Sequence, residues 1–107
     1  MMTLNKTWTE CLAMWHWIVE EWKEDKKHSA TLLKTRWLQK NDPTAILYNG
    51  CYFCDYCGCE CKKCPGRLVA PKFYCQNISY HFLHCPDKFL KKLEKLNRKR
   101  LSKKVKI

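Results

Sequence analysis

Eight of the nine cysteines of this 107-residue chain lie between Cys51 and Cys85, and this cluster constrains the fold more than any other feature. Such a density requires disulfides, metal ligands or redox groups. Residues 1–27 lack the basic start, unbroken apolar run and cleavage site of a secretory signal, so we expect a reducing cytoplasm. In that compartment paired cysteines indicate metal ligands. The middle of the chain is therefore expected to fold around a metal ion.

Two C-x-x-C pairs define the expected metal site, in a stretch that reads CYFCDYCGCECKKC over residues 51–64. Each pair can present two thiolates to one ion through a tight turn, and two pairs suffice for a tetrahedral zinc site. A further cysteine downstream is also within reach. We therefore predict zinc as the cofactor, with ligands drawn from Cys51, Cys54, Cys61, Cys64 and Cys75.

Other ligand choices stay open at this point. A second site, or a different set of four ligands, could use Cys57, Cys59, Cys85, His81 and His84. Four cysteines of the cluster also have the C-x-x-C-x-x-C-x-x-x-C spacing of an iron–sulfur protein, namely Cys51, Cys54, Cys57 and Cys61. Two features argue against an iron–sulfur cluster. The proline that usually follows the fourth ligand of such a run comes after Cys64 rather than Cys61, and no second run of this type occurs. Cys11, far from the cluster, is expected to be a buried thiol.

The first 41 residues predict a helical hairpin. The sequence TWTE at residues 7–10 matches a capping box, which predicts a helix start there. Apolar residues at spacings of four and three then form one stripe that should face the core. Its members are Trp8, Leu12, Trp15, Val19 and Trp22. Ser29 is the expected cap of a second helix, which runs to Lys40 with Leu33 and Trp37 inward.

The rest of the chain predicts little strand and one more helix. Residues 45–48 are expected to form a short strand before an Asn-Gly turn, and residues 67–75 an edge strand at best. Cys85-Pro86-Asp87 has the composition of a helix start. We therefore expect a small α+β fold with one domain over residues 1–107. Its parts are a helical hairpin (1–41), a cysteine-rich zinc-knuckle segment (42–86) and a basic amphipathic helix (87–107).

Most of the net charge of +11 belongs to the last segment, where residues 87–107 hold ten Lys or Arg against two acids. Such a segment attracts nucleic acid, an acidic protein face or an anionic membrane surface, unless it is only a solvated tail. No stretch approaches the roughly 20 apolar residues of a membrane span, so we expect a soluble protein. The expected partner-binding residues are Lys91, Lys92, Lys95, Arg98, Lys99 and Arg100.

Nothing in the sequence predicts an enzyme. Closed, all-thiolate metal sites are structural, whereas catalytic zinc keeps an open position and usually has His or carboxylate ligands. Neither an H-E-x-x-H motif nor a glycine-rich phosphate loop occurs. His81 and His84 beside Cys85 could argue otherwise, but solvated or core histidines are the simpler interpretation.

The cysteine pattern resembles that of small cysteine-rich zinc-binding proteins encoded by phages and prophages of Gram-positive bacteria. The resemblance rests on Trp15-His16-Trp17, on C-x-x-C-D-Y at residues 51–56, on C-x-x-C-P at residues 61–65 and on Cys75. It implies a counter-defence protein, such as an anti-CRISPR inhibitor, that binds a host protein or nucleoprotein complex in the host cytoplasm. The alternatives are a nucleic-acid-binding zinc-module regulator and an iron–sulfur electron carrier.

Overall fold

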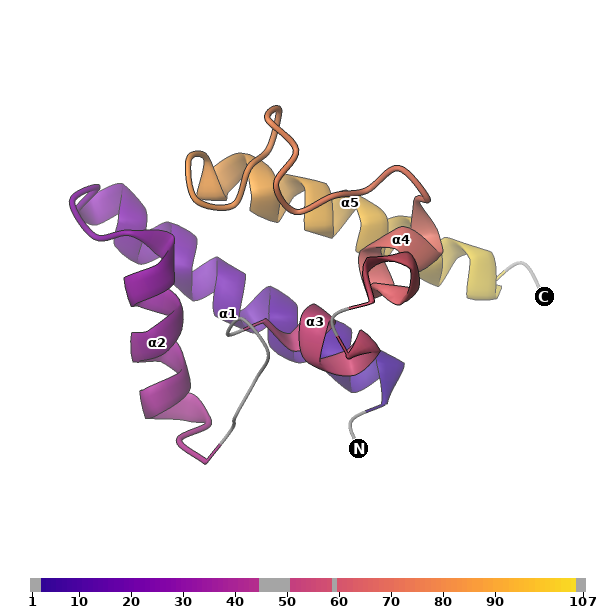
Figure 1. Ribbon diagram of the computed structural model, residues 1–107, viewed down its shortest axis with the longest axis horizontal. Helices are drawn as coiled ribbons and strands as arrows, with labels where there is room; N and C mark the ends of the chain where they lie inside the picture. The colour runs from indigo at the N-terminus through magenta and orange to yellow at the C-terminus, as the bar shows by residue number, and fades with distance from the viewer. Residues whose placement is uncertain (1–2, 45–50, 59, 106–107) are drawn as a thin grey trace.

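The computed structural model describes residues 3–44, 51–58 and 60–105, and helices make up its regular structure (Figure 1). In chain order these are α1 (Leu4–Glu24), α2 (Ala30–Asn41), α3 (Tyr52–Cys57), the 3₁₀ turn η2 (Cys61–Lys63), α4 (Pro65–Val69) and α5 (Pro86–Val105). The described ranges contain no strand. The expected α+β class is therefore wrong, and the fold of the described chain is all-helical.

The edge strand expected at residues 67–75 is replaced by α4 and a loop. Pro65 opens α4, since its fixed φ suits a first helical turn and its missing N–H is not needed there. The Arg67 side chain donates from Nε to the Phe73 carbonyl at 2.8 Å, which folds the following loop back onto α4. A Cβ at Gly66 would collide with the Phe73 ring, so glycine permits this close packing. The strand and turn expected at residues 45–50 lie outside the described residues.

The first helix begins earlier than the TWTE pattern predicted. Thr3 is its N-cap, and its Oγ1 accepts from the Lys6 amide at 3.1 Å. Thr7 lies within the helix, where its hydroxyl donates to the Thr3 carbonyl at 2.8 Å. A threonine hydroxyl can be satisfied by the preceding turn as well as by a cap, and here the earlier threonine takes the capping role.

The second helix starts where the sequence predicted. Ser29 caps α2, and its Oγ accepts from the Leu32 amide at 3.1 Å. Leu33 and Trp37 are buried, as expected for the inward face, and α2 packs against α1. The predicted N-terminal pair of packed helices is therefore present in the structure.

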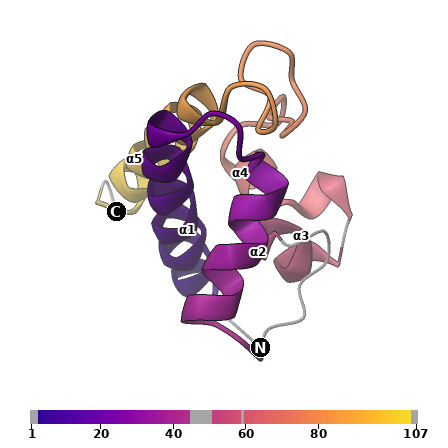
Figure 2. The same ribbon diagram turned by 90° about the vertical axis from the view of Figure 1, so that its left-hand side faces the viewer.

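Helix α1 is the centre of the fold. Seen from the side, α5 lies along one flank of α1 while α2 and α3 lie on the other (Figure 2). The predicted apolar face of α5 is buried, and Pro86 opens that helix as predicted. Its buried residues are Phe89, Leu90, Leu93 and Leu96. The core thus forms around α1, and the cysteine segment is held between α1 and α5, with α3 against α1 and α4 against α5.

The predicted tryptophan stripe is correct over only part of its length. Trp8 and Trp15 are each 1% exposed, and Val19 is also buried. Leu12 and Trp22 are only partly buried against the core. The fully covered face of α1 instead includes Met14 and Ile18 together with Cys11. No described helix has the length and apolar character that crossing a bilayer demands.

Candidate metal centre and basic surface

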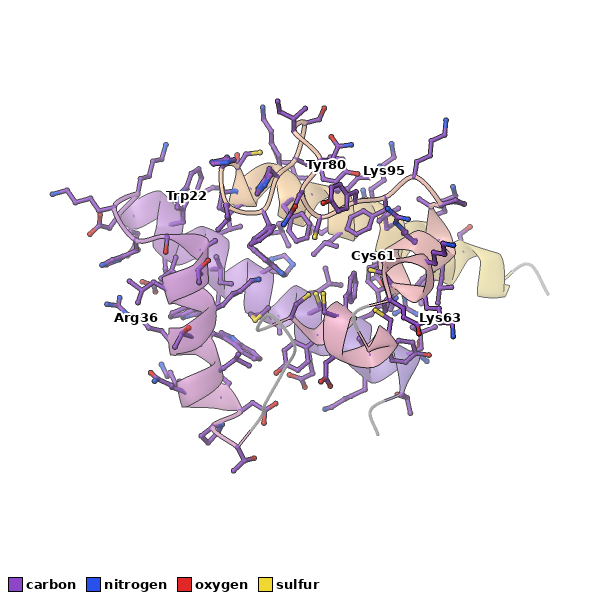
Figure 3. All side chains as sticks on the ribbon, in the orientation of Figure 1. Trp22, Arg36, Cys61, Lys63, Tyr80 and Lys95 are labelled. Atoms are coloured by element: carbon purple, nitrogen blue, oxygen red, sulfur yellow. The ribbon has the colours of Figure 1, made fainter. Side chains whose placement is uncertain are left out.

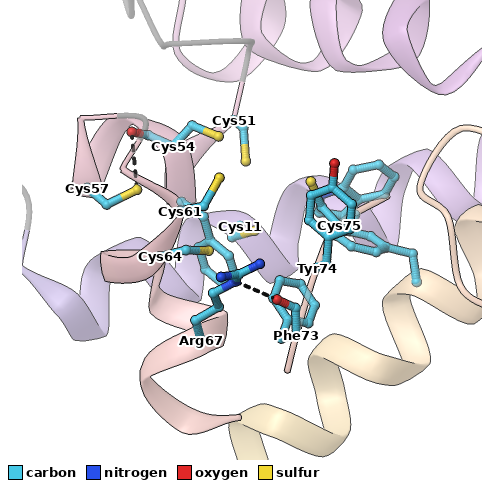
Figure 4. A pocket seen from close by; sticks show the side chains of 13 residues that line it. Cys11, Cys51, Cys54, Cys57, Cys61, Cys64, Arg67, Phe73, Tyr74 and Cys75 are labelled. Atoms are coloured by element: carbon cyan, nitrogen blue, oxygen red, sulfur yellow. Dashed lines mark hydrogen bonds between the residues drawn. The ribbon is translucent and has the colours of Figure 1, made fainter. Parts of the chain in front are cut away.

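Seven cysteines line one cavity of about 50 Å³ beneath α3 and α4 (Figure 4). This space is several times the ~10–15 Å³ that a single water molecule needs by the same kind of measure. Apart from Arg67, the other lining residues are aromatic, so the surroundings are largely apolar. The seven cysteines are Cys11, Cys51, Cys54, Cys57, Cys61, Cys64 and Cys75. All five cysteines that the sequence singled out as ligands are therefore brought to one place.

The thiols line the cavity, but their sulfur atoms do not converge on one point. Among the described residues, no three Cys, His, Asp or Glu side chains lie close enough together to hold one ion. Binding a metal would therefore require the cysteine side chains to turn inward. The donor set suits such an ion, because soft thiolates select zinc or an iron–sulfur cluster over hard cations.

Two of the thiols sit at the starts of short helices. Cys51 is the residue before α3, and Cys64 is the residue before α4. Neither sulfur makes a full capping hydrogen bond, but backbone amides of the following residues face both sulfurs and favour the thiolates. Helix starts are therefore the local device that orients these two donors toward the cavity.

The thiols differ in how readily they lose a proton. A hydrogen bond from the Cys54 side chain holds the pKa of Cys51 well below its usual range, against the opposing effect of burial and with help from the Lys34 ammonium. Burial raises the pKa of Cys64 to about 11 and also raises the pKa of Cys75. Burial raises the pKa of Cys11 as well. A bound metal ion would have to displace the protons of these thiols, as coordinating metals do.

Sequence reasoning missed two residues at this site. Cys11 was expected to be a buried thiol and is 1% exposed, but it also lines the cavity. Lys34 was not singled out, yet it is only 7% exposed, with its Nζ 4.4 Å from the centre of the Phe82 ring. The sequence did contain a sign of this burial, because Lys34 lies three residues before Trp37 and so shares the inward face of the predicted helix. Surface lysines are so common that this signal carried little weight.

The downstream histidines do not join the thiols. His81 and His84 have ring centres 4.6 Å apart in the loop before α5, and neither lines the cavity. The Cys85 thiol donates to the His81 carbonyl at 3.4 Å instead of facing the other cysteines. Cys59 lies outside the described residues. The donors brought together are therefore sulfur atoms, without imidazole.

The predicted basic surface of α5 divides into two parts. Lys91, Lys95, Arg98 and Lys99 are exposed. Lys92 stands over the Tyr80 ring, 5.4 Å from its centre. Tyr80 and Lys95 lie on the same side of the molecule (Figure 3). A groove runs along this side and is lined by Ser79, Tyr80, Lys88, Lys91, Lys92 and Lys95. We call these six residues the lysine groove.

Arg100 is not part of the exposed basic surface. Its guanidinium lies over the Trp8 ring and donates to the side-chain oxygens of Asn97 and Asn5. These contacts join α5 to the start of α1. The prediction that Arg100 is free to bind a partner is therefore not supported by its position.

Comparison with known protein families, curated proteins and solved structures finds no match to this chain. The resemblance of the cysteine pattern to phage-encoded proteins therefore stays a prediction. The thiol cavity and the lysine groove are the two features from which function can be argued.

Proposed function

We propose that this protein is a non-enzymatic, zinc-stabilised binding protein that inhibits a host macromolecular machine, such as a CRISPR effector nuclease, by docking on an acidic protein face. The observation that carries the proposal is the convergence of seven cysteines on one apolar cavity. A chain of this length has little stability to spare, so a metal at this point would stabilise the fold by holding its short helices together.

The surroundings of the cavity favour a structural role for the ion. Catalytic zinc needs an open coordination position for water and a general base beside it. Here the potential donors are thiols, and the other lining side chains are aromatic except for Arg67, which is engaged with the Phe73 carbonyl. Such a centre supports folding and gives no route to hydrolysis.

The lysine groove supports the binding half of the proposal. Four lysines on one face of α5 create a local positive field beside Tyr80, an aromatic residue that suits a protein interface. Such a field steers an acidic partner and speeds encounter more than it holds the complex. The counter-defence role itself comes from the resemblance of the cysteine motifs to phage-encoded proteins.

Metal analysis tests the first half of the proposal. Protein purified without added metal should contain zinc at about one or two ions per chain, determined by elemental analysis together with native mass spectrometry. Iron with acid-labile sulfide would instead indicate the iron–sulfur alternative. A chain with no metal after purification under reducing conditions, and with no zinc affinity, would reject the metal centre.

Titration against a purified effector nuclease tests the second half. A binding inhibitor should abolish nuclease activity at a fixed molar ratio, with no turnover. Progressive inactivation by sub-stoichiometric protein would instead reveal an enzyme. A fixed ratio that persists after prolonged incubation is the expected result.

The lysine groove also favours a second candidate function, binding of nucleic acid. Lysines can neutralise phosphates while an aromatic ring such as Tyr80 stacks on a base. Binding of this type weakens steeply with salt, with a slope of about −0.9 per contacted phosphate on duplex DNA. A salt series on DNA therefore separates the two candidates, because docking on a protein face need not show this slope.

A further inference from the structure

Ile78 is an exposed isoleucine in the loop that connects α4 to α5. It is 93% exposed, whereas the next most exposed large apolar side chain of the described residues, Leu68, is 56% exposed. Figures 1 and 2 both show this loop, residues 70–85, projecting beyond the helices that it joins. Packing of the core therefore does not account for an isoleucine at this position.

A hydrogen-bonded turn holds Ile78 in place. The Tyr80 amide donates to the Asn77 carbonyl at 3.0 Å, and the Ser79 amide donates to Asn77 Oδ1 at 2.9 Å. The Tyr80 ring stacks on the ring of the buried Phe73, with centres 5.9 Å apart, which anchors the turn to the core. Ile78 is thus a central residue of a β-turn, a position that favours glycine, asparagine, aspartate or serine. Local turn chemistry does not account for this isoleucine either.

The turn borders the lysine groove. Ser79 and Tyr80, which follow Ile78 in the chain, line that groove together with four lysines of α5. These lysines recur at spacings of three and four on one helix face, where like charges repel one another. None of the four forms an ion pair with a carboxylate of the chain that the structure describes. An exposed apolar side chain therefore lies beside positive charge that the protein itself does not neutralise.

This combination distinguishes between the classes of anionic partner. Nucleic-acid phosphates would neutralise the lysines but would leave the isoleucine in water. An acidic protein face would need a pocket shaped for this one side chain. A bilayer with anionic lipids supplies phosphates for the lysines and a fluid apolar interior that accepts a side chain of any shape. The observations therefore favour a lipid surface.

We propose that this protein binds the surface of an anionic lipid bilayer, with Ile78 inserted at the boundary of the acyl chains and the lysine groove set against the lipid phosphates. Binding of this kind at the surface needs no membrane-spanning helix. The inference goes beyond the proposed inhibition and does not depend on it. A bilayer and an acidic protein partner would compete for the same lysines.

Co-sedimentation with lipid vesicles tests the inference. The protein should bind vesicles of phosphatidylcholine and phosphatidylglycerol in equal parts, and should bind pure phosphatidylcholine vesicles far less, because clustered lysines respond to lipid charge. Added salt should weaken the binding. Reversal of Lys91 and Lys95 to Glu should abolish binding, whereas the same reversal at the exposed Lys27 and Lys40 should leave most of it.

Two variants of Ile78 test the apolar contact. Ile78→Ser should weaken binding about 10–100-fold, because the variant no longer removes an isoleucine side chain from water. Ile78→Trp should bind at least as tightly as the wild type, since tryptophan prefers the membrane interface. Leu68→Ser, at an exposed apolar position of α4 outside the lysine groove, is the matched control and should have no effect. Both positions are exposed, so the variants should keep the fold, which far-UV circular dichroism checks.

The outcomes are distinguishable. Folded wild-type protein that does not bind anionic vesicles overturns the inference, whatever it does to a nuclease. Equal binding by Ile78→Ser and the wild type also overturns it, because charge alone would explain the attraction. Loss of vesicle binding in Ile78→Trp overturns it as well, since a fluid interface should not reject a larger apolar ring. Vesicle binding as described here, without inhibition of a nuclease, would support this inference and reject the proposed function.

Discussion

The guanidinium of Arg100 lies 5.0 Å from the centre of the Trp8 ring and joins the last helix of the chain to the first. Nη1 donates to Asn5 Oδ1 at 2.7 Å, and Nε donates to Asn97 Oδ1 at 2.9 Å. Burial lowers the pKa of Arg100, but a guanidinium stays charged at neutral pH. Arg100 therefore fastens α5 to α1 and is separate from the lysine groove.

We expect Arg100→Ala to lower the free energy of unfolding by about 1–2 kcal/mol, because it removes two charge-assisted hydrogen bonds and a cation–π contact at a partly solvated site. Chemical denaturation followed by tryptophan fluorescence measures this loss. Arg98→Ala, which removes an exposed arginine from the same helix, should change stability by no more than ~0.5 kcal/mol. Equal effects of the two variants would show that the contact with Trp8 contributes nothing.

Metal removal should unfold the protein. A structural zinc site supplies on the order of 10 kcal/mol, which is comparable to the whole stability of a small domain. A strong chelator, or Cys54→Ser, should abolish the cooperative thermal transition, and added zinc should restore it only in the chelated wild type. Cys85→Ser is the matched control, since Cys85 does not line the cavity. Thermal melts that stay unchanged after verified metal removal would contradict the structural role.

Trp15→Ala should cost about 3–5 kcal/mol of unfolding free energy, as expected for a large side chain removed from a packed core. Trp15 is 1% exposed and meets Phe89 edge to face, with ring centres 4.7 Å apart. Trp22→Ala should cost less, because Trp22 is only partly buried. A soluble Trp15→Ala protein of wild-type stability that no longer bound its partner would instead make this face an interface.

Charge reversal in the lysine groove tests the docking surface. Replacing Lys91, Lys92 and Lys95 by Glu should slow association and remove its salt dependence, while dissociation changes less, if the partner is an acidic protein face. Loss of nearly all affinity would indicate phosphates instead. A matched triple variant at Lys27, Arg36 and Lys40 changes the net charge equally at exposed positions on and before α2. Of these, Arg36 lies far from Lys95 in Figure 3. Stopped-flow or surface-binding kinetics separate the two rates.

Stability should fall as the pH falls from about 8 to about 6. Folding lowers the pKa of Cys51 from its ordinary thiol value to about 6. The Cys51 thiolate therefore stabilises the folded state fully above the ordinary thiol pKa, and this contribution is lost as the pH falls toward 6. Folding raises the pKa of Cys64 to about 11, so its contribution to stability is lost only as the pH rises above the ordinary thiol pKa. Cys64 therefore does not change the trend between pH 8 and pH 6.

Protons also displace zinc from thiolates, which adds to the same trend. Urea denaturation across this pH range, in the presence of a fixed excess of zinc, measures the change. A free energy of unfolding that stays constant between pH 6 and pH 8 would show that no thiolate of this site contributes.

Features that depend on neighbours in the sequence were predictable. Ser29 caps α2, Pro86 opens α5, and the apolar positions of α5 are buried, because each depends on one helical turn or one helical period. The gathering of Cys51, Cys54, Cys61 and Cys64 on one cavity was also anticipated from their short separations.

Features that depend on contacts beyond a single helical turn were not predictable. The strand expected at residues 67–75 gave way to α4, because Arg67 and Gly66 meet Phe73 only in the folded chain. Arg100 was assigned to a binding surface because its contact with Asn5 spans 95 positions of the sequence. The helical period of the sequence does not indicate which charged side chain of a helix will pack against an aromatic residue far away in the chain.

The sequence by itself determined that most cysteines are near one another, that the C-terminal helix is basic, and where α2 and α5 begin. Only the tertiary structure decided that Cys11 lines the same cavity as the cluster and that Lys34 is buried against the rings of Trp15 and Phe82. The physical reason is that α2 and α3 pack on one flank of α1, and this packing buries every side chain on the facing sides of the three helices, polar or apolar.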